Sequence, residues 1–322
     1  MASHQIVGVS QEEERTTPFA YSSSEPVRPA DISEAAWLKP VAMSRSWSGP
    51  PVPRSCAWTG CALSVPMGTW TLNPQLITAD RITQPYDAVL LTVKGFQLEA
   101  ALADLARAIG PETMILPVRH MDILAERFSE HDLVGCALKV ATVIEEDGRI
   151  VQLMPLQDLA YGELDGRMTP RIQALNAFMR GAGFDARLSD AIRREMWEKW
   201  ILLASAGAIT CLMRGTIGEV VAAPGGIHFV LHLLDEAVAV VRVVGTAPSD
   251  EFLSAARDQL TAKGSPFASS MYRDLQQGRP IEVEEIIGDL LRRGTESGLS
   301  TPLLATAYTH LALYQNRIVP PR

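Results

Sequence analysis

The residue best suited to acid–base chemistry in this sequence is Lys199, which lies in the segment EMWEKW. On a helix it shares one face with positions 203, 206, 207 and 210, which hold Leu, Ala, Gly and Thr. A lysine on such a poorly hydrated face becomes a better proton donor. A lysine that snorkels at the rim of a packed helix fits the same pattern, and the residues alone favour that plainer interpretation.

A second group of polar residues follows in the segment SSMYRDLQQGRPIE. Glu282 stands just after Pro280 at a predicted helix start, where the helix dipole favours a carboxylate. Ser270 and Asp274 precede it in the same segment. Each residue also has a structural interpretation: Ser269 and Ser270 as helix N-caps, Asp274 as a solvated charge, and Glu282 as an ordinary helix-start acid.

Lys94 ends the apolar run 88–93, a pattern typical of a parallel strand buried on both faces. The carboxyl ends of such strands line the ligand crevice of an open parallel sheet, where a lysine can meet a phosphate or a carbonyl. A lysine that only solubilises the strand end fits about equally well.

No metal site is expected. His228 and His232 have metal-ligand spacing, but no glutamate or third ligand accompanies them, so a core or interface pair is the better interpretation. Cys56 and Cys61 have the wrong spacing for a zinc knuckle. The 4 cysteines are scattered and are expected to be reduced.

The composition limits the class of protein. A chain of 322 residues can form two cores, and its net charge of −8 argues against nucleic acid or an anionic membrane as partner. No apolar run is long enough for a membrane span, and the first residues do not have the pattern of a secretory signal. We therefore expect a cytoplasmic protein.

The texture of the sequence changes twice, which predicts three segments. Residues 1–66 are rich in Ser, Pro and Arg and are expected to be irregular or poorly packed. Residues 67–188 combine strand runs with a helix and predict an incomplete α/β Rossmann-type domain, with a hairpin of 134–144 and 149–154. Residues 189–322 predict an all-α domain.

The helical domain is expected to hold six helices. Their predicted ranges are residues 189–213, 225–244, 250–262, 269–276, 281–296 and 301–317. Thr301 and Pro302 form a typical N-cap and first-turn pair for the last of them.

Taken in order, four segments resemble the ketopantoate reductase (2-dehydropantoate 2-reductase) family. They are YDAVLLTVKGFQLEAAL, GCALKVATVIEEDGRIVQL, EMWEKW and SSMYRDLQQGRPIEVEEIIGDLL. The resemblance covers about residues 68–317 and implies NADPH-dependent reduction of a 2-oxo acid in pantothenate biosynthesis, with a site between the domains and a homodimer formed through the helical domain. It implies Lys199 as general acid, Ser270 and Glu282 as substrate-binding residues, Asp274 as their support, and Lys94 near the nicotinamide.

The sequence departs from this family in three places. Leu203 and Gly207 stand where the family usually has Asn, so a hydroxylated substrate would lose amide partners. The family's Asn-Gly turn after the 114–116 strand is absent, since Pro117 is followed by VRHM. The glycine-rich turn that holds a dinucleotide pyrophosphate is missing from residues 1–66.

A shift of reading by one base over residues 19–61 would explain the missing turn. Allowed codons convert FAYSSSEPVRPADIS into RIFVVGAGATGGYF, which contains a complete dinucleotide fingerprint. They convert LKPVAMSRSWSGPPVPRSCAWTGC into AEAGRDVTFLVRPSRAAQLRVDGL, a second strand followed by arginines. The alternative hypothesis is a genuine divergent N-terminal segment.

Three functional hypotheses follow. The first is an NADPH-dependent 2-oxo acid reductase, impaired by its N-terminal segment. The second is a non-catalytic association module, in which residues 189–317 only dimerise. The third is an oxidoreductase for another carbonyl or imine. Binding of NADPH would discriminate the first from the second.

Overall fold

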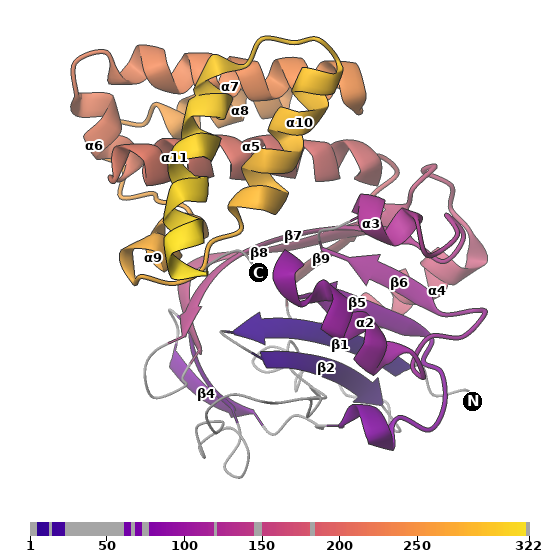
Figure 1. Cartoon of the computed structure of the whole chain (residues 1–322). Helices are drawn as coiled ribbons and strands as arrows, with labels where there is room; N and C mark the ends of the chain where they lie inside the picture. Colours follow the sequence, from indigo (N-terminus) through magenta and orange to yellow (C-terminus); the bar gives the residue numbers. More distant parts are fainter. Residues whose placement is uncertain are drawn as a thin grey trace. The chain divides into compact units, whose positions relative to one another are not determined.

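The chain forms two compact units, divided between Ile192 and Arg193. The computed structural model describes residues 5–12, 15–22, 61–65, 68–72, 77–118, 121–144, 150–180 and 184–319. The first unit carries the strands and the second is helical (Figure 1). The sequence predicted the division at residue 188, a few residues before the start of the long helix α5 (Ile192–Met213).

The first sheet of the strand-rich unit has the order β2-β1-β5-β6. The strands β1 (Gln5–Glu12), β5 (Ala88–Thr92) and β6 (Met114–Pro117) are parallel, as in a Rossmann-type sheet. The apolar run of β5 is buried as its sequence predicted, with Val89 and Leu91 almost fully inaccessible. After β5, a 3-10 turn (η4, Gly95–Gln97) leads into α2 (Leu98–Leu105), which buries its apolar face.

The edge of this sheet differs from a Rossmann-type sheet. The strand β2 (Arg15–Ser22) pairs antiparallel with β1, from Gln5 opposite Ser22 to Glu12 opposite Arg15. A Rossmann-type fold would place a crossover helix after its first strand and then a parallel strand. Here the chain reverses directly, because the partners Glu12 and Arg15 are separated by two residues.

Residues 1–66 were expected to be irregular or poorly packed, and the expected irregularity is wrong for three segments. The strands β1 and β2 and the strand β3 (Cys61–Val65) all fall in this range. Their pairing partners, β5 and β8, are distant in sequence, so the local composition gave no sign of them. The sheet is nevertheless aberrant for a Rossmann domain, because β2 runs antiparallel.

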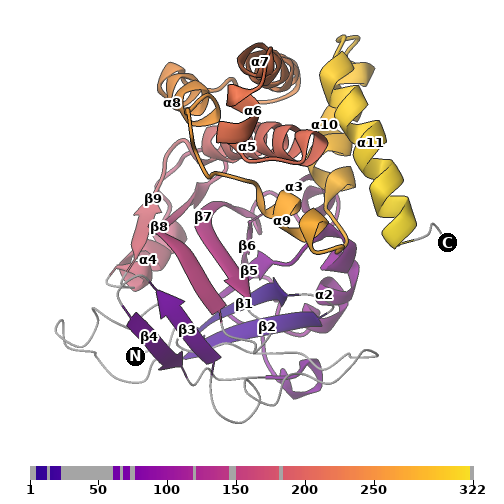
Figure 2. The same ribbon diagram turned by 90° about the vertical axis from the view of Figure 1, so that its left-hand side faces the viewer.

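The second sheet has the order β4-β3-β8-β7, with β9 also paired to β8 (Figure 2). The predicted hairpin is confirmed: β7 (Val134–Ile144) and β8 (Ile150–Glu163) are antiparallel, with Ile144 opposite Ile150. The strand β8 continues well beyond the predicted end at residue 154. The shorter strands are β4 (Gly68–Leu72) and β9 (Asp185–Leu188).

Three short elements complete this unit: η3 (Ala79–Arg81), α3 (Met121–Ala125) and α4 (Pro170–Met179). Only residues 118–120 separate β6 from α3. Thr169 caps α4 by accepting a hydrogen bond from the Ile172 amide at 3.3 Å, and Pro170 begins the helix.

The second unit is helical, as the sequence predicted. Its elements are α5, α6 (Ile217–Ala222), α7 (Gly226–Val244), α8 (Asp250–Leu260), α9 (Ser270–Gln276), the π-helical turn η5 (Glu284–Gly288), α10 (Asp289–Glu296) and α11 (Pro302–Ile318). Two details differ from the sequence-based expectation: the short helix α6 was missed, and the predicted helix 281–296 begins with a π-helical turn.

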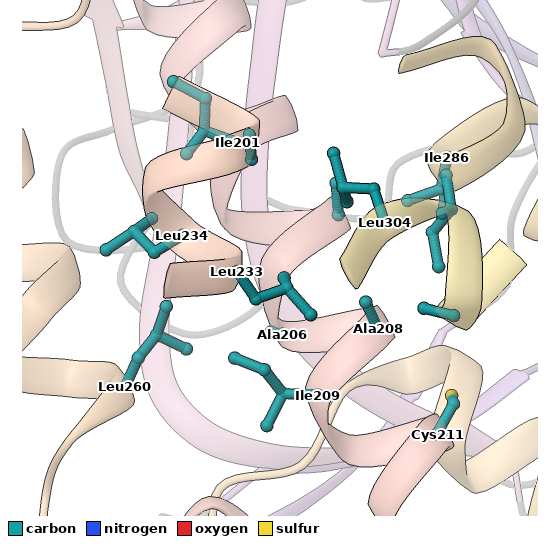
Figure 3. Close-up of a cluster of buried hydrophobic side chains, with 14 of the residues drawn as sticks. Ile201, Ala206, Ala208, Ile209, Cys211, Leu233, Leu234, Leu260, Ile286 and Leu304 are labelled. Atoms are coloured by element: carbon teal, nitrogen blue, oxygen red, sulfur yellow. The ribbon is translucent and has the colours of Figure 1, made fainter. Parts of the chain in front are cut away.

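One hydrophobic core joins these helices (Figure 3). Ile201 and Ile209 of α5, Leu233 and Leu234 of α7, and Leu304 of α11 are all fully buried. Burial of apolar surface stabilises the folded state by about 25 cal/mol for each Å² that is removed from water.

Two features position helix starts in the helical unit: a glycine at the start of α7 and a glutamate that caps α11. A Cβ at Gly226 would lie 1.7 Å from the Val220 carbonyl oxygen, so only glycine fits there. The N-terminus of α11 is capped by Glu236 of α7, whose carboxylate accepts from the amides of Leu303 and Leu304 at 3.1 and 2.9 Å. Thr301, the predicted cap, makes no such side-chain bond.

Candidate functional site

Lys199 lies on α5 in a half-buried position. Farther along the same face, Ala206 and Thr210 are buried and Leu203 packs against the core. The sequence predicted both the helix and the composition of this face.

The two tryptophans beside Lys199 hold α5 against the later helices. Trp197 and Trp200 stack with ring centroids 5.3 Å apart. The Trp200 indole N–H donates to the Ile286 carbonyl at 2.9 Å, and the guanidinium of Arg293 lies 5.4 Å from the Trp200 ring centroid. These contacts fix the stretch of α5 that carries Lys199 against η5 and α10.

A chain of three hydrogen bonds joins α9 to α5. The Tyr272 amide donates to Ser269 Oγ at 3.0 Å, so Ser269 is the N-cap of α9. Ser269 Oγ lies 2.8 Å from Thr210 Oγ1, which donates to the Ala206 carbonyl at 2.6 Å. With its proton committed to that carbonyl, Thr210 must accept from Ser269. Ser269 is therefore a structural residue.

Ser270, the next residue, has a different position. It begins α9 and its side chain is exposed, with no hydrogen bond to another residue in the described ranges. Of the two serines that the sequence singled out, one caps the helix and the other keeps its hydroxyl available. The sequence left both serines open as caps, because adjacent serines before a helix are equivalent by pattern.

Gly207, two turns after Lys199, faces Met271 of α9. A Cβ at Gly207 would lie 2.6 Å from the Met271 terminal methyl, closer than van der Waals contact. Met271 is only 3% exposed and fills the space that a side chain at position 207 would occupy. The glycine was evident in the sequence but its contact was not, since 64 positions separate the two residues.

Glu282 lies at the junction between α9 and the π-helical turn η5 and is 6% exposed. Its carbonyl accepts from the Ile286 amide at 3.1 Å, and the preceding amide, that of Ile281, donates to Gln315 at 2.8 Å. Single π-helical turns are common at functional sites. The sequence predicted Glu282 in the first turn of a helix, whereas in the structure Glu282 comes just before the helix begins.

Asp274 lies within α9 and is half-buried. Its carbonyl oxygen accepts from the amides of Gln277 and Arg279, at 3.2 and 2.9 Å, and so ends the helix. This backbone role shapes the loop that leads to Glu282.

The helical unit thus attaches all the segments that carry these residues to one helix. Near Lys199, Trp200 of α5 hydrogen-bonds to η5. In the middle of α5, Gly207 contacts Met271 of α9. Near the end of α5, Thr210 hydrogen-bonds to Ser269 at the start of α9. Thr210 lies eleven residues after Lys199, which corresponds to about 16 Å of helix rise. Lys199, Ser270 and Glu282 are therefore supported by the same scaffold.

Lys94 belongs to the strand-rich unit. It follows β5 and is the N-cap residue of η4, with a half-buried side chain. Because β1 and β5 are parallel, with Ser10 opposite Thr92, Lys94 lies at the edge where both strands have their carboxyl ends. This is the edge at which parallel sheets bind ligands.

The carboxyl end of β1 does not fit a dinucleotide. A pyrophosphate needs a glycine turn and the N-terminus of a helix, whose amides point at its oxygens. Here β1 passes into the antiparallel β2 instead. The sequence from Ser10 to Arg15 is SQEEER, and a run of three glutamates disfavours phosphate binding.

The histidines and cysteines do not form a metal site within the described parts of the chain. His228 and His232 are exposed, and their rings lie 3.8 Å apart between centroids. Cys136 and Cys211 are buried, and burial raises the pKa of the Cys211 thiol to about 12. Cys56 lies outside the described residues.

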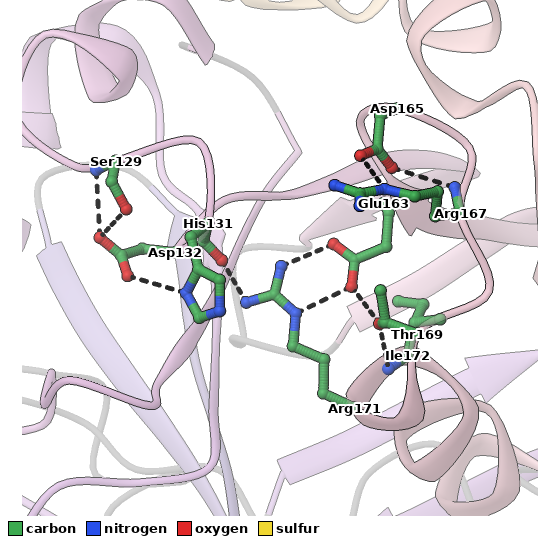
Figure 4. Close-up of polar contacts among 9 residues, drawn as sticks. All are labelled: Ser129, His131, Asp132, Glu163, Asp165, Arg167, Thr169, Arg171 and Ile172. Carbon is green, nitrogen blue, oxygen red and sulfur yellow. Dashed lines mark hydrogen bonds and ion pairs between the residues drawn. The ribbon is translucent and has the colours of Figure 1, made fainter.

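An ionic network in the strand-rich unit was not evident from the sequence (Figure 4). Arg171 donates to both carboxylate oxygens of Glu163, at 2.8 and 2.6 Å, and to the His131 carbonyl, while Thr169 donates to Glu163. Burial alone would raise the pKa of Glu163, but the bonds from Arg171 and Thr169 outweigh it and lower that pKa. The network ties the end of β8 to α4.

No helix in the described ranges is long and apolar enough to cross a membrane.

Two family models match this chain. The model described as "Ketopantoate reductase PanE/ApbA" matches residues 57–166, and "Ketopantoate reductase PanE/ApbA C terminal" matches residues 191–315. The first match starts at residue 57, near the end of the segment that lacks the glycine-rich turn.

Curated relatives agree with these matches. An uncharacterized oxidoreductase, YkpB of Bacillus subtilis, is 26% identical over 261 residues, which is 80% of this chain and 86% of that protein. A 2-dehydropantoate 2-reductase of Streptococcus pyogenes is 24% identical over 237 residues, 72% of this chain and 77% of that enzyme.

Solved structures share the fold. A 2-dehydropantoate 2-reductase from Geobacter metallireducens has a TM-score of 0.72 at 23% identity, covering 84% of this chain and 90% of that one. D-mandelate dehydrogenase, solved with NADH and anilino(oxo)acetate, has a TM-score of 0.72 at 16% identity, covering 82% and 88%.

Proposed function

The chain belongs to the ketopantoate reductase family, a family of oxidoreductases, and we propose that its helical unit is the substrate-binding half of a 2-oxo acid reductase. In this proposal Lys199 is the general acid, Ser270 and Glu282 bind the substrate, and Asp274 supports them. The observation that carries the proposal is the attachment of α9 and η5 to the helix of Lys199.

The roles follow from the chemistry of carbonyl reduction. Reduction of a ketone to an alcohol builds negative charge on the carbonyl oxygen. An ammonium beside that oxygen stabilises the charge and supplies the proton. The exposed hydroxyl of Ser270 can hydrogen-bond to the substrate, because the neighbouring Ser269 is the residue that caps α9.

The proposal takes NADPH as the reductant, as the resemblance implies, and expects Lys94 to lie near its nicotinamide. The carboxyl end of β1 does not fit the pyrophosphate of such a cofactor, so the proposal assigns no step to NADPH in the present chain. A chain that carried the shifted-frame segment would regain the glycine-rich turn and, with it, the amides that hold the phosphates.

A non-catalytic association module is the second candidate, and the β1–β2 pairing favours it. In that case residues 193–322 would serve only to form a homodimer. A ketopantoate reductase from Staphylococcus aureus is described as dimeric. Substrate binding discriminates the two candidates, because an association module has no reason to recognise a 2-oxo acid.

The test is to measure, by calorimetric titration, the binding of 2-oxo acids to the purified full chain. We expect saturable binding that Ser270→Ala weakens about tenfold, the loss of one hydrogen bond to a charged group. Leu313→Ala, an exposed substitution on α11, is the control and should change nothing. Absence of binding by every 2-oxo acid would refute the proposal.

A further inference from the structure

We propose that Arg273 of α9 binds the carboxylate of the 2-oxo acid substrate, on the helix face that also carries Ser270. The proposal rests on the proposed function, because it names the group that holds one end of that substrate. The roles given above leave this end without a cation, since Lys199 acts on the carbonyl oxygen and Ser270 is neutral.

The guanidinium of Arg273 lies at the start of α9. One of its N–H groups donates to the Ala268 carbonyl at 3.2 Å, and Ala268 comes two residues before Ser270, the first residue of the helix. The side chain therefore extends back toward the N-terminus of α9, the direction that helical side chains favour. Because residues three apart are neighbours on a helix surface, Ser270 and Arg273 present their polar groups together.

This face of α9 is open to solvent. The opposite face packs into the core of the helical unit, where Met271 and Leu275 are each 3% exposed. Ser270 is exposed and Arg273 is half-buried. A ligand can therefore reach the pair without displacing a core side chain.

The charge of Arg273 is only partly satisfied. A guanidinium has five N–H donors, and within the described ranges the Ala268 carbonyl is the one acceptor that the Arg273 guanidinium meets. No carboxylate in these ranges forms an ion pair with it. Burial lowers the pKa of Arg273, and the attraction of Asp274 offsets only part of this effect. A bound anion would supply the missing acceptors and the opposite charge.

A carboxylate matches the donors that remain. The planar fork of a guanidinium donates two parallel N–H bonds to the two oxygens of one carboxylate. The Ser270 hydroxyl can donate a further bond to the same group. The contact with Ala268 holds the guanidinium in place and so reduces the entropy that such binding would cost.

The test compares a 2-oxo acid with its uncharged amide. Calorimetric titration of the full chain with 2-oxobutanoate and with 2-oxobutanamide measures what the carboxylate charge contributes. We expect the acid to bind at least about tenfold more tightly, because hydrogen bonds between charged partners are about twice as strong as neutral ones. This comparison needs no variant, so it does not depend on the folding of a mutant.

Arg273→Gln should remove most of this preference. It keeps a donor group but no charge, so 2-oxobutanoate should bind about 10- to 100-fold more weakly, while the affinity for 2-oxobutanamide changes less than about threefold. Arg273→Lys should keep part of the preference, since an ammonium retains the charge but not the fork. Arg242→Gln is the matched control: it removes the same charge from an exposed position on α7 and should leave both affinities unchanged.

Several results would overturn the inference and leave the proposed function standing. They are equal binding of acid and amide by the parent chain, a preference that Arg273→Gln does not reduce, and an equal loss for both ligands in that variant. The last would show that Arg273 only supports the loop before α9. If Arg273→Gln does not fold, an unchanged preference in Arg273→Lys overturns the inference instead. If no 2-oxo acid binds the parent chain, the proposed function fails and the inference fails with it.

Discussion

The helical unit and the strand-rich unit differ in whether the groups expected to contact a ligand remain available for it. In the helical unit, Ser269 and Thr210 hold α9 in place and leave the hydroxyl of Ser270 exposed. In the strand-rich unit, β1 keeps its parallel pairing with β5, but the turn after it leads into β2.

This difference shows that a sheet can keep its strand pairing although the strand that follows runs in another direction than in a Rossmann-type fold. The pairing of β1 with β5 satisfies backbone groups whichever way the chain turns afterwards. A pyrophosphate requires one particular turn. The framework is therefore more tolerant of sequence change than the site that it supports, and the following predictions test this contrast.

The largest effect is expected for NADPH binding. Replacing residues 19–61 by the shifted-frame peptide should tighten it about 10²- to 10⁴-fold, since two charge-assisted hydrogen bonds are each worth about 1.5–3 kcal/mol. Fluorescence titration measures the change. Changing glutamates 12–14 to Gln is the control: it removes the repulsion but restores no helix N-terminus, so binding should stay weak. Micromolar NADPH affinity in the present chain would contradict the prediction.

The next effect concerns turnover in that loop-restored chain. Lys199→Ala should lower the rate of 2-oxo acid reduction by about two to four orders of magnitude, the usual contribution of a positioned general acid. NADPH affinity should change little, because the lysine acts on the carbonyl oxygen. A variant with nearly the parent rate would identify Lys199 as a snorkelling residue.

A smaller effect is expected on stability in the strand-rich unit. Glu163→Gln should lower its free energy of unfolding by on the order of 2 kcal/mol at pH 7, because Arg171 loses a partly buried partner. Thermal denaturation followed by circular dichroism measures it. The control is Asp165→Asn, which removes an exposed ion pair with Arg167 and should cost little.

The same pair predicts the pH dependence of stability. The folded pKa of Glu163 is lower than the ordinary value of 4.5, so its stabilisation is complete above pH 4.5 and is lost as pH falls through the folded pKa. The Glu163→Gln variant should lack this component. An equal loss of stability in parent and variant as the pH is lowered through this range would contradict the assignment.

The smallest expected effect is a difference in stability between alanine variants of the two adjacent serines. Ser269→Ala should cost about 1 kcal/mol of stability, through the lost N-cap and the unsatisfied Thr210. Ser270→Ala should leave the melting temperature unchanged, yet weaken binding of 2-oxo acids. Equal melting temperatures for both variants would show that the cap is not formed in solution.

Much of the helical unit could be predicted from the sequence. The ranges of α7, α9 and α11 agree with the prediction to within one or two residues, because caps and apolar spacing are local signals. Lys199 lies on a helix, as predicted, for the same reason. The hairpin of β7 and β8 was also predicted, since its turn lies between its own strands.

Tertiary structure alone decided the rest, because the deciding partners are far apart in sequence. The β1 segment is a strand because β5 supplies its hydrogen bonds, and α11 begins where Glu236 of α7 caps it. The contact of Gly207 with Met271 likewise joins two helices. The sequence by itself determined the helices and the chemical groups on their faces, whereas packing decided which of those groups are engaged structurally and which can meet a ligand.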